Sequence, residues 1–283
     1  MEKEIVVPNP ADESLGSQLV SLYQIFKGIP KNNTLTFDLN RLKWPQPFLL
    51  LSLAAYVAKS GSMFNMDALT ASTRSYLQTI AFPGGATAVS EFQKSKTYIP
   101  IGALRRAVST HERESLESAF SKMIKDVSQT DEGAIDALYY PITELITNIF
   151  EHSQADVGFV FGQYYPKKRY LDICIVDAGR GMAKSYEIEK QLKYSDEEAI
   201  MEAMKGRSTK PSGERGYGVH TSKNLVTKGL GGEFVLVSGS AAFLADKKQE
   251  QLVKLADFYW QGTILAYRIP KLDHAIDISS YYE

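Results

Sequence analysis

The segment LDICIVDAGRGM, residues 171–182, constrains the fold of this chain more than any other part of the sequence. Its apolar run predicts a strand that ends at Asp177. Gly179 and Gly181 follow that end, and glycines there let another group approach the backbone closely. A carboxylate in such a place can accept a hydrogen bond from an adenine amino group. In the alternative interpretation, Asp177 only caps a turn between a strand and a helix.

A helix with a polar face is predicted by the segment TELITNIFEHS, residues 143–153. Glu144, Asn148 and His152 recur every four residues and therefore share one face. The asparagine carbonyl suits a Mg²⁺ ion bound to phosphates. A carboxylate one turn earlier can polarise a water, or accept the proton of a hydroxyl, that attacks a γ-phosphate. The alternative is a stripe of polar side chains that simply faces solvent.

A glycine-rich run, KGRSTKPSGERGYGVHTSKNLV at residues 205–226, leads into another predicted helix, which begins near Gly218. Backbone N–H groups and the positive end of a helix dipole suit phosphate oxygens. Lys205, Arg207 and Lys210 precede the helix and would contact a γ-phosphate, unless they are merely solvated. The run lacks the Gly-Lys-Ser/Thr end of a P-loop and does not follow a strand, as a dinucleotide fingerprint requires.

Together with a short QGT motif, Gln261–Thr263, these segments resemble in order and spacing the N, G1, G2 and final Gly-Thr elements of the GHKL ATPases (gyrase, heat-shock chaperone, histidine kinase, MutL). The resemblance implies a left-handed, Bergerat-type α/β sandwich that binds ATP and Mg²⁺, with the stretch from about Ala183 to Tyr217 as the ATP lid. The implied roles are general base for Glu144, Mg²⁺ ligand for Asn148, adenine reader for Asp177, hinge below the base for Gly179 and Gly181, triphosphate loop for Gly216 and Gly218, and second adenine contact for Thr263. The other nucleotide contacts expected are His152, Lys210, Tyr217, Val219, His220 and Thr221.

Within this family, TELITNIFEHS looks closest to the anti-sigma serine kinases and the histidine kinases, which share a Glu-x-x-x-Asn-x-x-x-His pattern. Glu151 departs from many histidine kinases, which carry a basic residue there, and is more like the chaperone and MutL branch. His111, in HERESL, superficially resembles a phosphoacceptor. Because roughly 32 residues separate His111 from Glu144, a long dimerising hairpin has no room between them, and a histidine kinase is rejected.

The N-terminal half carries a strand, loop and helix pattern over residues 34–60, followed by a short strand and helix within residues 63–82. The first pattern looks like STAS-like domains, the fold of anti-sigma-factor antagonists, which mostly mediate protein contacts. The alternative is an α/β cap specific to this protein. A connecting amphipathic helix is predicted over His111–Gln129.

The predicted fold class is therefore α/β, with a boundary near residue 110. Residues 111–283 are expected to form a two-layer α/β sandwich of the GHKL type with a mixed sheet, and residues 1–110 a smaller α/β domain, STAS-like or not. The elements expected in the second domain are a helix over about 133–153, strands over about 157–164 and 169–176, a helix from about 218, and strands over about 233–238 and 262–268.

The composition points to a cytoplasmic protein. Cys174 is the only cysteine, so no disulfide framework is expected and a reducing compartment fits best. The first residues lack a secretion signal, and the longest apolar stretch, Phe48 to Ala58, is too short to cross a membrane. A formal net charge of -1 gives no global attraction to nucleic acid or acidic membranes. His220 and His274 lack metal-ligand spacing with each other or with the cysteine, so no zinc site is expected.

The function expected from these motifs is Mg²⁺-dependent ATP binding with slow hydrolysis. Lid closure over the γ-phosphate would alter contacts with an unidentified protein partner of the N-terminal domain. Two alternatives are a serine/threonine protein kinase of the anti-sigma type and a non-enzymatic ATP or ADP sensor. GHKL domains often act as dimers, so the resemblance also implies a homodimer.

Overall fold

The computed structural model is a mixed α/β structure built on two separate sheets. It describes residues 3–31, 33–91, 97–106, 110–128, 142, 146, 153–207, 218–271, 277 and 281. One sheet has seven strands in the order β4-β5-β6-β10-β7-β8-β9, and the other has three in the order β1-β2-β3.

The large sheet is antiparallel at every neighbouring pair of its strands, so the mixed sheet expected for the second half of the chain is a wrong prediction. The physical reason is connectivity: β5 and β6, β7 and β8, and β8 and β9 are joined by short turns, and such turns can join only antiparallel strands. The strands are β4 (Tyr98–Arg105), β5 (Val157–Tyr165), β6 (Tyr170–Asp177), β7 (Glu233–Gly239), β8 (Ala241–Ala245), β9 (Glu250–Lys254) and β10 (Trp260–Pro270).

The small sheet is parallel, because helices connect its strands. Its strands β1 (Lys3–Val6), β2 (Leu35–Asp38) and β3 (Met63–Asn65) alternate with the helices α1 (Leu15–Phe26) and α2 (Pro47–Ser60), and α3 (Ala71–Thr79) follows. The predicted strand, loop and helix of residues 34–60 are confirmed as β2 and α2. Gly61 ends α2 in the left-handed conformation, with φ 70°, as its place in the sequence suggested.

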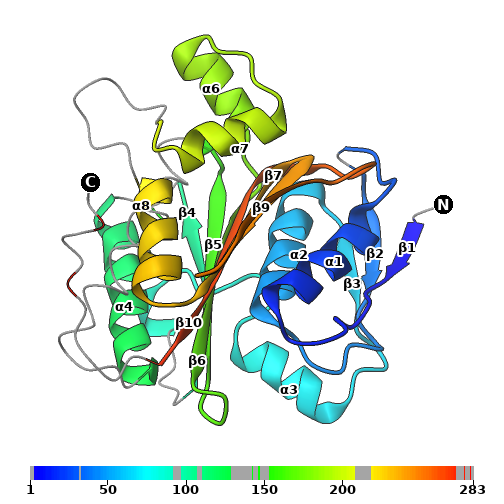
Figure 1. Ribbon diagram of the computed structural model, residues 1–283. Helices are drawn as coiled ribbons and strands as arrows, with labels where there is room; N and C mark the ends of the chain where they lie inside the picture. Colours follow the sequence, from blue (N-terminus) through cyan, green and yellow to red (C-terminus); the bar gives the residue numbers. More distant parts are fainter. Residues whose placement is uncertain are drawn as a thin grey trace.

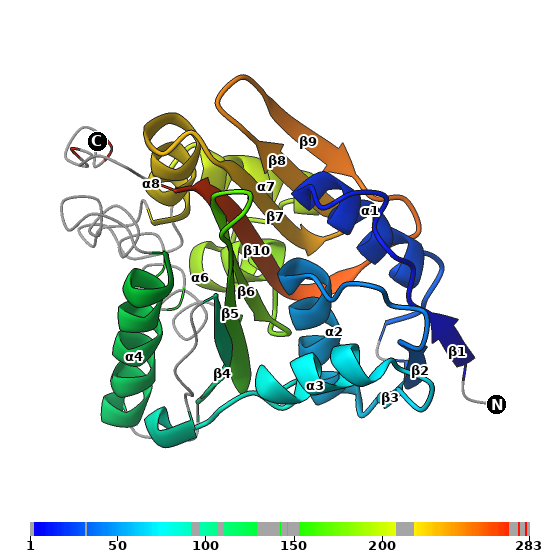
Figure 2. The same ribbon diagram turned by 90° about the horizontal axis from the view of Figure 1, so that it is seen from below.

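Helices cover both faces of the large sheet (Figure 1). The helices α1 and α2 lie between the large sheet and the small one, whereas α4 (Thr110–Ser128) and α8 (Gly218–Asn224) lie on the opposite face. Figure 2 shows the same arrangement from below. Side chains alternate between the two faces: Phe159 and Phe161 join the core under α1 and α2, while Val160 between them joins the core under α4 and α8.

The strands expected around the glycine motifs are confirmed as β5, β6, β7 and β10, and the helix from Gly218 is confirmed as α8, which continues as a π-helical turn, Leu225–Gly229. The connecting amphipathic helix is α4. Of the helix expected over residues 133–153, Ile142 and Ile146 are described and both are buried. Most of that helix lies outside the described residues.

Several elements were not predicted. The stretch expected to be the ATP lid contains two helices, α6 (Met182–Lys190) and α7 (Asp196–Met204), before the undescribed residues 208–217. The strand β4 precedes the expected boundary near residue 110 but pairs with β5 of the large sheet. The division into two domains stays a prediction. In the part of the chain that the structure describes, no helix is long and apolar enough to cross a membrane.

Candidate functional site

Two of the predicted site residues, Asp177 and Thr263, lie directly opposite each other on the central strands β6 and β10. Both follow the alternation of Ile175 and Leu265, whose side chains belong to the core on the side of α4 and α8. The structure therefore brings together residues far apart in the sequence, at one end of the sheet and on one face.

The carboxylate of Asp177 is buried, with 3% of the residue exposed. Its Oδ1 accepts a hydrogen bond from the N–H of Gly179 at 2.8 Å, and the Ser153 side chain and the Thr263 backbone also bond to the carboxylate. Burial raises the pKa of Asp177 to about 7, and these hydrogen bonds keep it from rising further. No cationic side chain among the described residues pairs with it.

Gly179, in the loop after β6, packs against Ser153, the last residue of the TELITNIFEHS motif. A Cβ atom at Gly179 would lie 2.3 Å from the carbonyl oxygen of Ser153, so only glycine fits there. The next residue, Arg180, donates its N–H to the same oxygen at 2.9 Å. Ser153 thus contacts both the loop and the buried aspartate. Sequence reasoning assigned it no role, although it is the last residue of the polar motif.

The second glycine of the loop, Gly181, has φ 76° and forms the N-cap of α6. Ser238, on β7, fixes the loop here: its Oγ accepts a hydrogen bond from the N–H of Met182 at 3.0 Å and donates one to the carbonyl of Gly262 at 2.8 Å. A Cβ atom at Gly181 would lie 3.2 Å from that Oγ. The loop is thereby held against the ends of β7 and β10.

The structure explains the glycine of the QGT motif, which the sequence alone did not. Gly262 has φ 108°, and a Cβ atom there would lie 2.2 Å from the carbonyl oxygen of Asp177. The indole N–H of Trp260 donates to that same oxygen at 3.2 Å. The start of β10 is therefore shaped around the end of β6, which sets Thr263 beside the aspartate.

The helix α8 carries four of the predicted phosphate contacts: Gly218, Val219, His220 and Thr221. Both ring nitrogens of His220 are used inside the protein, since Nδ1 donates to the carbonyl of Met204 and Nε2 accepts from the Asn224 amide at 2.8 Å. His220 thus ties α8 to the end of α7. The hydroxyl of Thr221 is buried and makes no hydrogen bond within the described part of the chain.

The other expected site residues, Glu144, Asn148, His152, Lys210, Gly216 and Tyr217, lie outside the described residues. The general base and the Mg²⁺ ligand therefore stay predictions. Among the residues that the structure does describe, no group of three or more His, Cys, Asp or Glu side chains could hold a metal ion.

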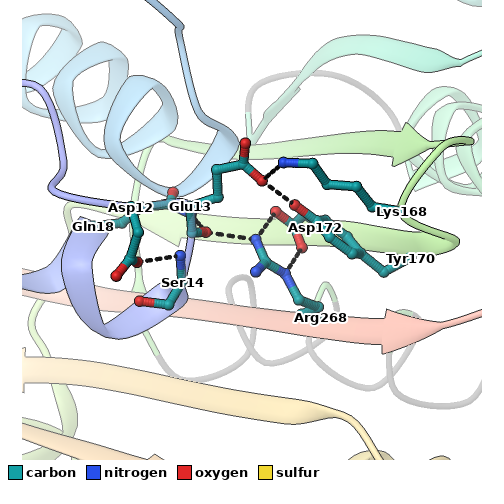
Figure 3. A network of polar contacts seen from close by, with 8 residues as sticks. All are labelled: Asp12, Glu13, Ser14, Gln18, Lys168, Tyr170, Asp172 and Arg268. Atoms are coloured by element: carbon teal, nitrogen blue, oxygen red, sulfur yellow. Dashed lines mark hydrogen bonds and ion pairs between the residues drawn. The ribbon is translucent and has the colours of Figure 1, made fainter.

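A second buried aspartate, Asp172, was missed by sequence reasoning (Figure 3). The guanidinium of Arg268, directly across on β10, donates to both carboxylate oxygens, at 2.7 and 2.8 Å. Arg268 also donates to the carbonyl of Glu13 at 2.7 Å and stacks on the Tyr170 ring, whose hydroxyl donates to the Glu13 carboxylate at 2.9 Å. This network fastens the segment before α1 to the large sheet. Burial raises the pKa of Asp172 to about 6, and Arg268 opposes that rise.

No protein-family model and no curated protein matches this chain.

Proposed function

We propose that the chain is an adenine-nucleotide-binding protein of the GHKL type, with Asp177 as the acceptor for the adenine amino group. The observation that carries this proposal is the buried Asp177 carboxylate, which has hydrogen-bond donors around it but, among the residues that the structure describes, no cation. A buried carboxylate without a counter-charge is costly, and such groups occur preferentially at functional sites. An amino group that donates to its second oxygen would offset part of that cost.

The surroundings of Asp177 support adenine in particular. Thr263 stands beside it on β10 and offers a second polar contact. The close approach of Ser153 to Gly179, and of Ser238 and Gly262 to Gly181, fixes the loop around the carboxylate. The buried hydroxyl of Thr221, near the start of α8, has no hydrogen-bond partner among the described residues and is a further group that a ligand would satisfy. These features favour a nucleotide over a purely structural role for the motif.

The proposed Mg²⁺ binding and ATP hydrolysis depend on the TELITNIFEHS motif, which ends at Ser153. The Asn148 carbonyl would hold a Mg²⁺ ion, which supplies charge neutralisation to bound phosphates, and Glu144 would accept a proton from the attacking water. We expect Glu144→Ala to keep ATP binding and lose turnover, and Asn148→Ala to weaken only the Mg²⁺-dependent part of binding. Calorimetric titration and a phosphate-release assay measure the two effects. Undiminished turnover in Glu144→Ala would remove the general-base role.

The same assay separates hydrolysis from the alternative of a serine/threonine kinase. The alternating strands and helices of β1 to β3, packed against the sheet that bears Asp177, are compatible with a protein substrate or regulator domain in the same chain. With γ-labelled ATP, label on a protein favours phosphoryl transfer, and label solely in free phosphate favours an ATPase. If the protein binds ATP but yields neither labelled protein nor labelled phosphate, the result favours a nucleotide sensor.

A further inference from the structure

A hollow of about 590 Å³ lies at the end of the large sheet, beyond Gly181. One wall is the α6–α7 segment, another is the turn between β7 and β8, and Lys31 and Tyr259 close it from the side of the N-terminal half. Neither Asp177 nor Thr263 lines it, although Gly181, the second glycine of the loop after β6, does. Its size falls in the range of small-molecule sites.

The lining of this hollow carries more positive than negative charge. Its basic residues are Lys31, Arg180, Lys184, Lys193 and Lys254, and its acidic residues are Glu187, Asp196 and Glu197.

All three carboxylates already have partners. Glu187 pairs with Lys184 at 2.7 Å, and Glu197 pairs with Lys254 at 3.2 Å. Asp196 accepts hydrogen bonds from the N–H and the hydroxyl of Ser240, both at 2.8 Å. The two ion pairs occupy Lys184 and Lys254, and Asp196 keeps its charge under the Ser240 hydrogen bonds, which leaves Lys31, Arg180 and Lys193 as the other cations of the lining.

The basic excess resides mainly on two lysines from different walls. The ammonium of Lys31 lies 3.4 Å from the centre of the Tyr259 ring, a contact that orients the lysine but does not neutralise its charge. Lys193, in the segment between α6 and α7, is exposed, and its charge helps the Lys184 contact to hold the pKa of the Glu187 carboxyl below its usual value. Arg180 adds a third cation, whose guanidinium also binds Glu189 at 2.6 Å.

We propose that this hollow binds a small organic phosphate, with Lys31 and Lys193 holding the phosphate group. Flexible ammonium groups act as point charges for phosphate and need no fixed geometry. The rings of Tyr194 and Tyr259 also line the hollow and offer apolar surface to the organic part of the ligand. A ligand held in this way links the N-terminal half to the α6–α7 segment.

The test is titration of the full chain with inorganic pyrophosphate, followed by calorimetry and by the backbone amide NMR signals of Ala183 and Lys184 at the hollow. The Lys31→Ala/Lys193→Ala double variant is expected to bind pyrophosphate at least about tenfold more weakly. The matched control is Lys247→Ala/Lys248→Ala, which removes the same charge from two exposed lysines outside the hollow and is expected to bind as the wild type does.

Asp177→Asn is expected to bind pyrophosphate unchanged, so failure of the adenine proposal and failure of this one give different results. An equal loss in both lysine double variants would overturn the proposal, because it would show unspecific charge attraction. Unchanged affinity in Lys31→Ala/Lys193→Ala, or pyrophosphate-induced shifts confined to α8, would overturn it as well.

Discussion

Strand β6 carries two buried aspartates, Asp172 and Asp177, near its opposite ends and on opposite faces of the large sheet. Asp172 meets the guanidinium of Arg268 in a two-pronged ion pair. Within the described part of the chain, Asp177 meets hydrogen-bond donors from Ser153, Gly179 and the Thr263 backbone, and no cation. Burial raises the pKa of both carboxyls, to about 6 and about 7.

The difference separates a structural carboxylate from one suited to a ligand. A buried charge with a complete partner is satisfied inside the fold, and its role is to join elements, here the segment before α1 and the sheet. Asp177 accepts three hydrogen bonds and meets no cation among the described residues, so its carboxylate has acceptor capacity for one more donor. The two ends of β6 are therefore expected to respond differently to the same kinds of substitution.

The largest expected effect is on stability, from Arg268→Ala. Removing the arginine leaves the Asp172 carboxylate, 2% exposed, without its partner, and we expect the free energy of unfolding to fall by about 3–5 kcal/mol. Urea denaturation followed by circular dichroism measures this. The double variant Asp172→Leu/Arg268→Met, which removes both charges, is expected to recover most of the loss. If the free energy of unfolding fell by less than about 1 kcal/mol in Arg268→Ala, the pair of Asp172 and Arg268 would contribute no more than a surface ion pair.

The next effect is on ligand binding, from Asp177→Asn. Oδ1 of the side chain must still accept from the Gly179 N–H, so the new amide NH₂ takes the other position and faces the adenine amino group, donor against donor. We expect ATP affinity to fall by roughly 100-fold, measured by calorimetry. The matched control is Asp172→Asn, which is expected to lower stability and leave the ATP affinity of the folded protein unchanged. Equal ATP affinity in wild type and Asp177→Asn would contradict the claim that Asp177, unlike Asp172, binds a ligand.

A smaller effect is the pH dependence of stability without nucleotide. The pKa of Asp177 is raised from 3.8 to about 7, so the folded protein binds more protons than the unfolded chain between these values. The stabilising contribution is therefore present at low pH and is lost as the pH rises through about 7. The slope is at most about 1.4 kcal/mol per pH unit for one proton. Asp177→Asn should flatten the part of the slope nearest pH 7, in urea denaturations repeated across the pH range, and an unchanged slope would remove Asp177 as its source.

On ATP affinity, Gly179→Ala is expected to have a smaller effect than Asp177→Asn, because it moves the acceptor without removing it. The added methyl would lie 2.3 Å from the Ser153 oxygen, so the loop must shift and move the acceptor of Asp177. We expect about a tenfold loss of ATP affinity. Gly84→Ala is the control, since a Cβ there meets nothing within 4 Å. A larger loss from the control than from Gly179→Ala would mean that the loop geometry does not set the site.

The sequence predicted the strands that carry Asp177 and Thr263, because their apolar runs and glycines are local signals. It did not predict that Asp172 pairs with Arg268, since that depends on the register of β6 against β10. The strand β4 was missed because Pro100 and Gly102 interrupt its pattern. They are tolerated because β4 is an edge strand with an irregular register next to them.

The two helices of the expected lid, α6 and α7, were not predicted, for different reasons. Only two residues of α6, Ser185 and Tyr186, are buried, so its sequence carries little apolar periodicity. The helix α7, by contrast, begins with a capping box formed by Ser195 and Glu198, a signal that is legible in the sequence. The expected site residues before Ser153, and those between Arg207 and Gly218, stay predictions from their motifs alone.

Competitive titration with ATP and GTP tests the central claim most directly. At about pH 8 the Asp177 carboxyl, with a pKa of about 7, is ionised and acts only as an acceptor. Adenine presents an amino group to it, whereas guanine presents a carbonyl oxygen at the same position. With Mg²⁺ present, we expect ATP to bind at least about 100-fold more tightly than GTP. Equal affinities, or no binding of ATP, would contradict the assignment of Asp177 as the adenine reader.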